Sequence, residues 1–274
     1  MECAQWRSTS GERADGALLH LTIGPGASTL ERMRFRLLSY NIHKGIGGLD
    51  RRYDLARIVE TIRHYQPDVA LLQEVDDGAK RSRHDCQVDL LADALELPHR
   101  AYQRNVRLRT IGHYGNAVLS RWPLLDAVDV DLTIPLKKRR CALVCRFEAV
   151  VHGHKRLIGL ANVHLGLAGF ERQIQLRRLL RGELFSNGHE DMPLVIGGDF
   201  NDVWENLGKK VMHPAGFELA SGMIKTFPAA APLRKLDRIF CRGPIESIGS
   251  FAGHTGLAKR ASDHLPLIVD FEVK

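Results

Sequence analysis

A carboxylate and a carboxamide, Asp199 and Asn201, stand two residues apart after two glycines and a short apolar run at residues 194–196. The apolar run predicts a buried strand, and the glycines would let the backbone bend tightly or approach a ligand closely. In an extended backbone, residues i and i+2 point to the same side, so both polar side chains would face one spot at the carboxyl end of the strand. Open α/β sheets bind their ligands at such ends. A structural Asx turn explains the pair equally well.

Similar polar residues follow other apolar runs of the chain. Each alone has a structural explanation, because carboxylates and amides often cap turns and helices. Burying all of them at one spot without a function would be costly, since an unsatisfied buried polar group costs about 1–3 kcal/mol. We therefore expect a site built from Asn41, Glu74, His164, Asp199, Asn201, Asp237, Asp263 and His264.

Oxygen ligands dominate this set, which favours a hard cation such as Mg²⁺ or Mn²⁺ over zinc. Mg²⁺ usually binds one or two protein carboxylates and keeps waters that a substrate phosphate can displace. Glu74 is the first predicted metal ligand, with Asn41 and Asp263 beside it. A second metal near Asp199 and Asn201 stays open as an alternative.

Four further residues are candidates for substrate binding. Asn116 is expected to contact a phosphate oxygen or, equally well, to cap the start of a strand. Arg140 is expected to donate two hydrogen bonds to a phosphate. Arg81 is expected to line the pocket mouth. Lys44, which is not one of the four, is expected to face solvent. The candidates are His43, Arg81, Asn116 and Arg140.

The elements that must position these residues alternate between strands and helices. No linker or repeat divides the chain after residue 33, so mixed sheets covered by helices in one domain are expected. The expected helices are 55–65, which Asp54 would cap, 88–95, and 170–184, with Ile174 among its inward residues. The expected strands are 35–40, 69–72, 115–120, 141–150, 157–164, 194–196, 236–241 and 267–271.

The 274 residues carry a formal net charge of +7, which favours a polyanionic or phosphate-bearing partner. No apolar run approaches the roughly 20 residues of a membrane helix, and the amino-terminal sequence does not look like a signal peptide. Residues 1–33 are expected to be a disordered extension and residues 34–274 the folded domain. Five cysteines without a Cys-x-x-Cys pattern indicate free thiols in a reducing compartment, and hence a cytoplasmic protein. No obligate protein partner is indicated.

From about residue 35 to its end, the chain resembles the endonuclease/exonuclease/phosphatase superfamily. Each shared segment is a weak signal alone, but seven in the right order are specific. The likeness is greatest to an uncharacterised bacterial branch of the superfamily. The segments are Ser-Tyr-Asn-Ile-His-Lys-Gly, Leu-Gln-Glu-Val, Gly-Asn-Ala-Val-Leu-Ser-Arg, Asn-Val-His-Leu-Gly, Gly-Gly-Asp-Phe-Asn-Asp, Leu-Asp-Arg-Ile-Phe and Ser-Asp-His-Leu-Pro-Leu.

The resemblance implies a DNase I-like α/β fold, a four-layer sandwich in which two mixed β-sheets pack face to face with helices outside. It also implies Mg²⁺-dependent hydrolysis of a phosphate ester, with Glu74 on the metal, assisted by Asn41 and Asp263. The two residues His43 and His164 depart from the apurinic nucleases of the superfamily and match its phosphodiesterase and phosphatase branches better.

The same resemblance assigns the remaining catalytic roles. His264 would pair with Asp237, a couple that fixes the imidazole tautomer and raises its basicity. Asp199 and Asn201 would position or deprotonate the attacking water, while His164 would face the phosphoryl oxygens as charge builds. Whether Asp199 or His264 acts as the base stays open at this point.

The leading hypothesis is therefore a metal-dependent phosphodiesterase that acts on nucleic acid, a phospholipid headgroup or a small phosphodiester. The basic charge favours nucleic acid, but no stripe of basic and aromatic residues supports it. A lipid substrate would need an exposed apolar loop, for which Ile134-Pro135-Leu136 beside the basic run 137–140 is the one suggestive stretch. A catalytically silent binding module that reuses the fold is the alternative.

Overall fold

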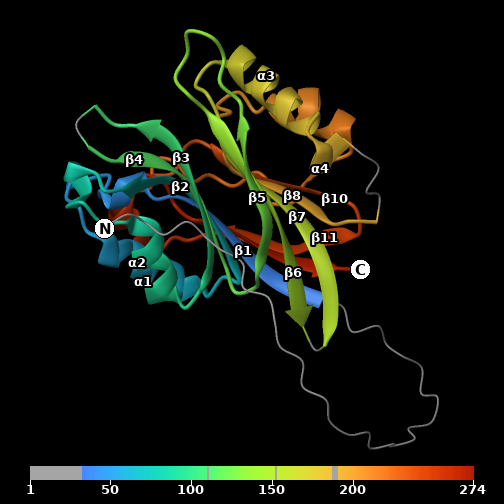
Figure 1. Ribbon diagram of the computed structural model, residues 1–274, viewed down its shortest axis with the longest axis horizontal. Helices are drawn as coiled ribbons and strands as arrows, with labels where there is room; N and C mark the ends of the chain where they lie inside the picture. Colours follow the sequence, from blue (N-terminus) through green and yellow to red (C-terminus); the bar gives the residue numbers. More distant parts are fainter. Residues whose placement is uncertain (1–32, 110, 152, 187–190) are drawn as a thin grey trace, which may run out of the picture. The chain divides into compact units, whose positions relative to one another are not determined.

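A computed structural model describes residues 33–109, 111–151, 153–186 and 191–274. Within them, twelve strands form two six-stranded sheets, the first in the order β11-β12-β1-β2-β4-β3 and the second in the order β5-β6-β7-β8-β10-β9 (Figure 1). The expected extension at 1–33 lies outside the described residues except for Met33, which begins β1. The first sheet contains β1 (Met33–Asn41), β2 (Val69–Asp77), β3 (His99–Arg107), β4 (His113–Ser120), β11 (Ile245–Ala252) and β12 (Leu267–Val273). The second contains β5 (Leu124–Asp131), β6 (Cys141–Val151), β7 (His154–His164), β8 (Leu194–Asp199), β9 (Glu218–Leu219) and β10 (Asp237–Arg242).

Both sheets are mixed, as expected. Only β1–β2 and β7–β8 pair in parallel, and the other neighbours are antiparallel. The inner faces of the sheets meet in one apolar core, where Leu71 of the first sheet lies in the same cluster as Val195 of the second. Phe147 stacks on Trp122 with ring centroids 5.8 Å apart in that core. Burial of these inner faces holds the two sheets together.

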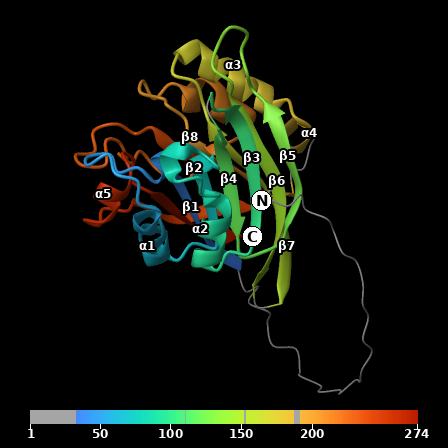
Figure 2. The ribbon, with the colours of Figure 1, turned by 60° about the vertical axis from the view of Figure 1, so that its left-hand side comes forward.

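Helices cover the outer faces, which completes the four-layer sandwich (Figure 2). Ile58 and Leu91, from α1 and α2, pack on the first sheet, while Leu176 and Phe185, from α3 and α4, pack on the second. No helix in the described part of the chain is long and apolar enough to cross a membrane. The helices are α1 (Leu55–Tyr65), α2 (Gln87–Leu95), α3 (Gly169–Leu180), α4 (Glu183–Ser186) and α5 (Ala258–Ala261), with shorter turns η1 (His43–Gly45), η2 (Lys80–Ser82), η3 (Gly208–Met212) and η4 (His213–Ala215).

Two helix expectations need correction. Asp54 precedes α1, but its side chain makes no capping hydrogen bond and instead lies 3.0 Å from Arg57. The helix expected at 170–184 ends at Leu180, and a turn at Gly182 separates it from α4. Ile174, expected to point inward, is exposed.

The two glycines before Asp199 allow β8 to pack closely against its neighbours. A Cβ atom on Gly197 would lie 2.7 Å from Leu71 Cδ1 of the facing sheet. On Gly198, whose φ is +143°, a Cβ atom would lie 2.0 Å from the carbonyl oxygen of Val163 in β7. Only glycine lets β8 lie this close to both neighbours, so this sequence fixes the strand end that carries Asp199.

We expect Gly198→Ala to destabilise the fold by about 3 kcal/mol or more, because the added methyl group meets backbone that cannot move aside. Denaturant unfolding followed by circular dichroism measures this change. Gly256→Ala is the matched control, since a Cβ atom there has no neighbour within 4 Å, and it should change stability by less than about 0.5 kcal/mol. Equal stability of the two variants would contradict the packing role.

Candidate active site

Strand register brings the predicted residues together at one end of the two sheets. His164 at the end of β7 and Asp237 at the start of β10 both lie beside Asp199, the last residue of β8. Asn41 ends β1 in the other sheet, and its Nδ2 donates a 3.1 Å hydrogen bond to Asp199 Oδ2. This bond joins the ends of the two sheets.

Asp199 lies at the centre of the site and is almost fully buried. Its Oδ2 lies 3.6 Å from Nε2 of His164 and 3.8 Å from Nε2 of His264. Its Oδ1 accepts a 2.9 Å hydrogen bond from the backbone N–H of Asn201. Burial raises the pKa of Asp199 to about 6, although the His264 imidazole opposes that rise.

His264 and Asp237 form the predicted couple, with Nδ1 of the ring 2.8 Å from Asp237 Oδ2. The hydroxyl of Thr226 donates to the same carboxylate oxygen, and the Phe227 ring lies 4.9 Å from the imidazole, centroid to centroid. Burial disfavours the charged imidazole, but the Asp237 carboxylate outweighs it and raises the pKa of His264 to about 10. The couple therefore fixes the ring so that Nε2 faces Asp199.

Asn201 lies beside this centre but its side chain is turned to the neighbouring loop. Its Nδ2 donates a 3.0 Å hydrogen bond to the carbonyl oxygen of Leu165, next to His164, and its backbone is left-handed with φ of 50°. The residue thus ties the end of β8 to the end of β7. Its backbone N–H, which binds Asp199, and its carboxamide both serve to hold the site together.

Glu74 occupies a bulge in β2, where the pairing with β4 shifts between Leu72 and Val75 and Glu74 takes φ of 56°. Lys44, which was expected to face solvent, contacts the Glu74 carboxylate with its ammonium group. Burial would raise the pKa of Glu74, but the neighbouring His164 and Lys44 lower it to about 2. His164 is itself neutral near pH 7, because burial and Arg140 lower its pKa, so Lys44 is the lasting counter-charge.

The oxygen donors suit a hard cation bound mainly through Glu74. Among the described residues, no three His, Cys, Asp or Glu side chains lie close enough to hold a metal by themselves. Mg²⁺ needs only one or two protein carboxylates, with water completing the shell, and the ionised Glu74 supplies one. Asn41 Oδ1 accepts the backbone N–H of His43 at 3.0 Å and keeps a second lone pair. Asp263 lies farther out, with one oxygen 3.9 Å from His43 Nδ1.

The other predicted substrate residues differ in how many hydrogen-bond donors they have left for a ligand. Arg140 is only 6% exposed, and its Nε and Nη1 have no hydrogen-bond partner. The Asn116 amide, by contrast, donates to Gln103 Oε1 at 3.1 Å and to the Cys141 carbonyl at 3.3 Å. Arg81 makes two hydrogen bonds to Asp76, at 2.8 and 2.7 Å. Arg140 therefore has the most capacity for an anionic ligand.

A buried polar bridge beneath the site was not foreseen. Gln73 Nε2 donates to Asn162 Oδ1 at 2.8 Å, across the two sheets. Asn162 Nδ2 in turn donates to the carbonyl oxygens of Leu72 and Ala117, both at 2.9 Å. The sequence marks Asn162 only as a residue on the same strand face as His164 and does not reveal its partner in the other sheet.

A further supporting contact comes from Ser262. Its hydroxyl donates to the carbonyl oxygen of Asn41 at 2.7 Å and accepts from the backbone N–H of His264 at 3.2 Å. This single side chain holds the segment before β12 against the end of β1. Its place directly before Asp263 and His264 is the only sequence signal for this role.

The contact between Lys44 and Glu74 leads to a prediction about metal binding. The ammonium group and a bound cation would compete for the same carboxylate, so Lys44→Met should strengthen Mn²⁺ binding several-fold by calorimetry. Glu74→Gln should weaken it at least tenfold, because the amide carries no charge. A Lys44→Met protein that binds Mn²⁺ more weakly than the parent would refute this competition.

Comparison with known proteins places this geometry in a family. The Endonuclease/Exonuclease/phosphatase family matches residues 38–264. An uncharacterised protein of Escherichia coli K12, YbhP, is 33% identical over 265 residues, which cover 89% of this chain and 98% of YbhP.

Solved structures agree in fold. An endonuclease/exonuclease/phosphatase from Beutenbergia cavernae superposes with a TM-score of 0.70 at 23% identity, over 88% of this chain and 72% of that one. ANGEL2, a 2′,3′-cyclic phosphatase, superposes with a TM-score of 0.67 at 17% identity, over 89% of this chain and 96% of its own. The match to residues 38–264 and the likeness to YbhP show that the chain belongs to the endonuclease/exonuclease/phosphatase family.

Proposed function

We propose that the protein is a divalent-metal-dependent phosphodiesterase that hydrolyses its substrate by in-line attack of an activated water. The observation that carries the proposal is the setting of Asp199, which has His164 and His264 within 4 Å on its Oδ2. The guanidinium of Arg140, whose Nε and Nη1 have no hydrogen-bond partner, adds a buried positive charge that lowers the pKa of His164. A phosphate group would satisfy these donors, because it offers several acceptor oxygens and negative charge.

The chain's own residues account for positioning and proton transfer. The attacking water would lose its proton to Asp199, whose Oδ2 lies 3.8 Å from Nε2 of the protonated His264. A new P–O bond forms as the P–O bond to the leaving alcohol breaks, and the leaving oxygen takes up a proton from solvent. His164 and Arg140 would stabilise the charge on the phosphoryl oxygens.

A hard cation held by Glu74, with Asn41 and Asp263 near it, would polarise the phosphoryl group and offset its negative charge. Mg²⁺ or Mn²⁺ fits the oxygen donors of this set. Glu74 is ionised over the whole neutral range, since its pKa is about 2. The chain therefore needs no proton release at this carboxylate to bind a cation.

A phosphodiester is the favoured substrate class because the unpaired cation of the site is Arg140, whereas His264 is paired with Asp237 and Lys44 with Glu74. His164 is neutral near pH 7, and the guanidinium of Arg81 is held by Asp76. ANGEL2, which shares the fold, is a phosphatase of a cyclic phosphate. The alternative, a catalytically silent binding module, would not require a His264–Asp237 couple that faces the buried Asp199 carboxylate.

We also propose a cytoplasmic location. Three cysteines of the described residues are free and buried: Cys141, Cys145 and Cys241. Unpaired thiols are usual in reducing compartments.

The first activity test uses a bis-aryl phosphodiester with Mg²⁺ or Mn²⁺ and with EDTA. We expect metal-dependent hydrolysis, and a loss of about 100-fold or more in His264→Ala, since proton transfer by a positioned side chain contributes about that much. Folding of the variant is checked by its unfolding transition. Absence of turnover by the parent protein, or full activity of His264→Ala, would count against the proposal.

Arg140 allows a second activity test. Removing a charged hydrogen-bond donor from a buried site costs about 1.5–3 kcal/mol, so Arg140→Met should lower kcat/KM about 10- to 100-fold on the same diester. Arg139→Met is the matched control, because Arg139 is the exposed neighbour, and it should change kcat/KM less than about twofold. Equal effects of the two substitutions would remove Arg140 from the phosphate site.

A further inference from the structure

The most exposed large apolar side chains of the described residues all lie in loops at the active-site end. Elsewhere, exposed apolar residues reach at most 55%, the value for Phe170. Isolated exposed apolar residues need no explanation, but a concentration of them marks an interaction surface. We call the following five residues the apolar rim: Leu136 (105% exposed), Leu167 (76%), Trp204 (76%), Leu233 (71%) and Leu49 (66%).

Each rim residue follows or contacts a part of the site. Leu167 comes three residues after His164, and Trp204 comes five residues after Asp199. The neighbour of Leu49, Gly48, packs on Asp263, since a Cβ atom there would lie 2.7 Å from the Asp263 Cα. The rim residues are therefore tied to the pocket in sequence and in space.

The two remaining members lie in loops that the site also borders. Leu233 donates its backbone N–H to Phe227, whose ring lies against His264. Leu136 is in the loop between β5 and β6. The base of this loop is closed by the backbone N–H of Leu132, which donates a 2.9 Å hydrogen bond to the Arg140 carbonyl oxygen. All five loops thus lie at the strand ends that carry the candidate active site.

Side-chain contacts join four of these loops to one another. Lys137 lies 3.1 Å from Glu171 and 5.6 Å from the Phe170 ring, which connects the β5–β6 loop to the start of α3. Arg172 binds the Leu167 carbonyl and lies 3.8 Å from Asp202. Lys235 and Glu205 pair at 2.9 Å, which connects the loops of Leu233 and Trp204. Four of the five rim loops are therefore linked to one another.

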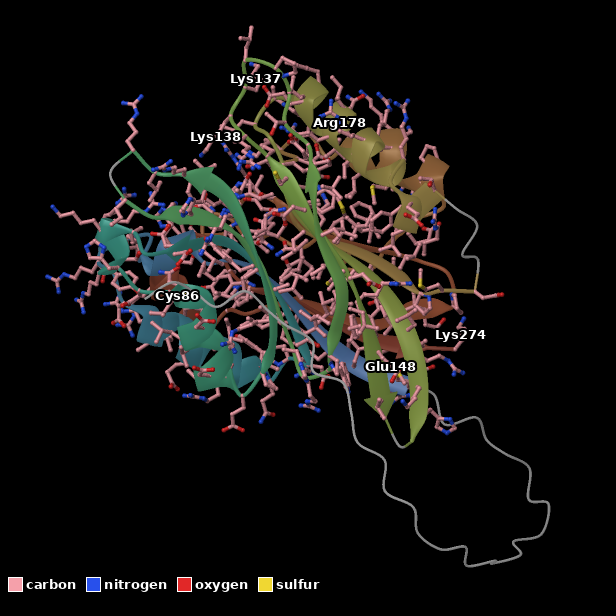
Figure 3. The ribbon with its side chains drawn as sticks, in the orientation of Figure 1. Cys86, Lys137, Lys138, Glu148, Arg178 and Lys274 are labelled. Atoms are coloured by element: carbon pink, nitrogen blue, oxygen red, sulfur yellow. The ribbon has the colours of Figure 1, made fainter. Side chains whose placement is uncertain are left out.

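Positive charge is interleaved with the rim. Lys137 and Lys138 follow Leu136 in the β5–β6 loop, and Figure 3 shows Lys137 near the outer end of this loop. Lys138 Nζ lies 5.0 Å from the Tyr114 ring of β4. Arg139, next to Lys138, and Arg234, next to Leu233, are also exposed. The acidic neighbours Glu171 and Glu205 are each paired with a lysine. An anionic surface would complement this charge.

The position of the rim restricts what can cover it. Any large partner seated on loops around the pocket mouth would block the site unless it carried the substrate itself. Four of the five rim residues are leucines, which cannot stack on bases as a single-strand binding surface requires. Aliphatic side chains flanked by lysine and arginine are typical of surfaces that enter the headgroup region of anionic membranes.

We propose that the apolar rim docks on an anionic phospholipid bilayer and presents a lipid headgroup phosphodiester to the candidate active site. The leucines and Trp204 enter the interface between headgroups and acyl chains, while the basic residues bind the anionic headgroups. The identity of the substrate rests on the proposed phosphodiesterase activity. The docking itself does not, because it requires no turnover.

The test is co-sedimentation of the full chain with vesicles in EDTA, which separates docking from hydrolysis. We expect binding at least tenfold stronger to vesicles with one-third phosphatidylglycerol than to pure phosphatidylcholine, and weaker binding at high salt. The double variant Leu136→Ser/Leu233→Ser should lose at least tenfold in binding. Leu157→Ser is the matched control, because Leu157 is exposed at the end of β7 remote from His164, and it should bind like the parent.

Failure to bind anionic vesicles, or equal binding by the rim variant and the parent, would overturn the docking proposal. Rim-dependent binding of oligothymidylate without vesicle binding would also overturn it and assign the surface to nucleic acid. Vesicle binding by a protein that does not cleave the soluble aryl diester would instead refute the catalytic proposal while docking stands.

Discussion

The hydrogen bond from Asn41 to Asp199 is the contact on which the site depends, because it is made where two separate sheets end. Each sheet is held by its own ladder and helices, yet the reacting groups come from both. The shared apolar core sets the distance between the sheets, and the Gln73–Asn162 bridge beneath the site sets their alignment. A small sliding of one sheet against the other would separate Glu74 from Asp199 and its histidines.

The site also concentrates buried charge, which is costly unless each group is compensated. Most of its members compensate one another: Lys44 neutralises Glu74, and Asp237 neutralises His264. Arg140 is the exception, since two of its nitrogens lack a partner within the protein. Buried donors without a partner in the protein are expected at functional sites, because a bound ligand supplies the missing hydrogen-bond acceptors.

The sequence was most informative where the chain is most buried. The eight interior strands were all anticipated, because burial on both faces demands a continuous apolar run. The four edge strands, β3, β5, β9 and β11, were missed, since they carry polar residues that resemble loop sequence. For the site, strand-end polar residues were identifiable, but the Lys44 contact and the Gln73–Asn162 bridge depend on how the sheets face each other. No one-dimensional pattern encodes that relation.

The bulge at Glu74 has a consequence for the length of β2. Leu71 packs between the sheets, whereas Leu72 and Val75 both pack under the helices, so the alternation of the strand is reset at the bulge. Without the extra residue, Val75 would stand two residues after Leu72 and would still pack on the helix side by regular alternation. The core therefore does not need the bulge, and the added residue instead lets β2 carry a carboxylate at a position outside the regular ladder.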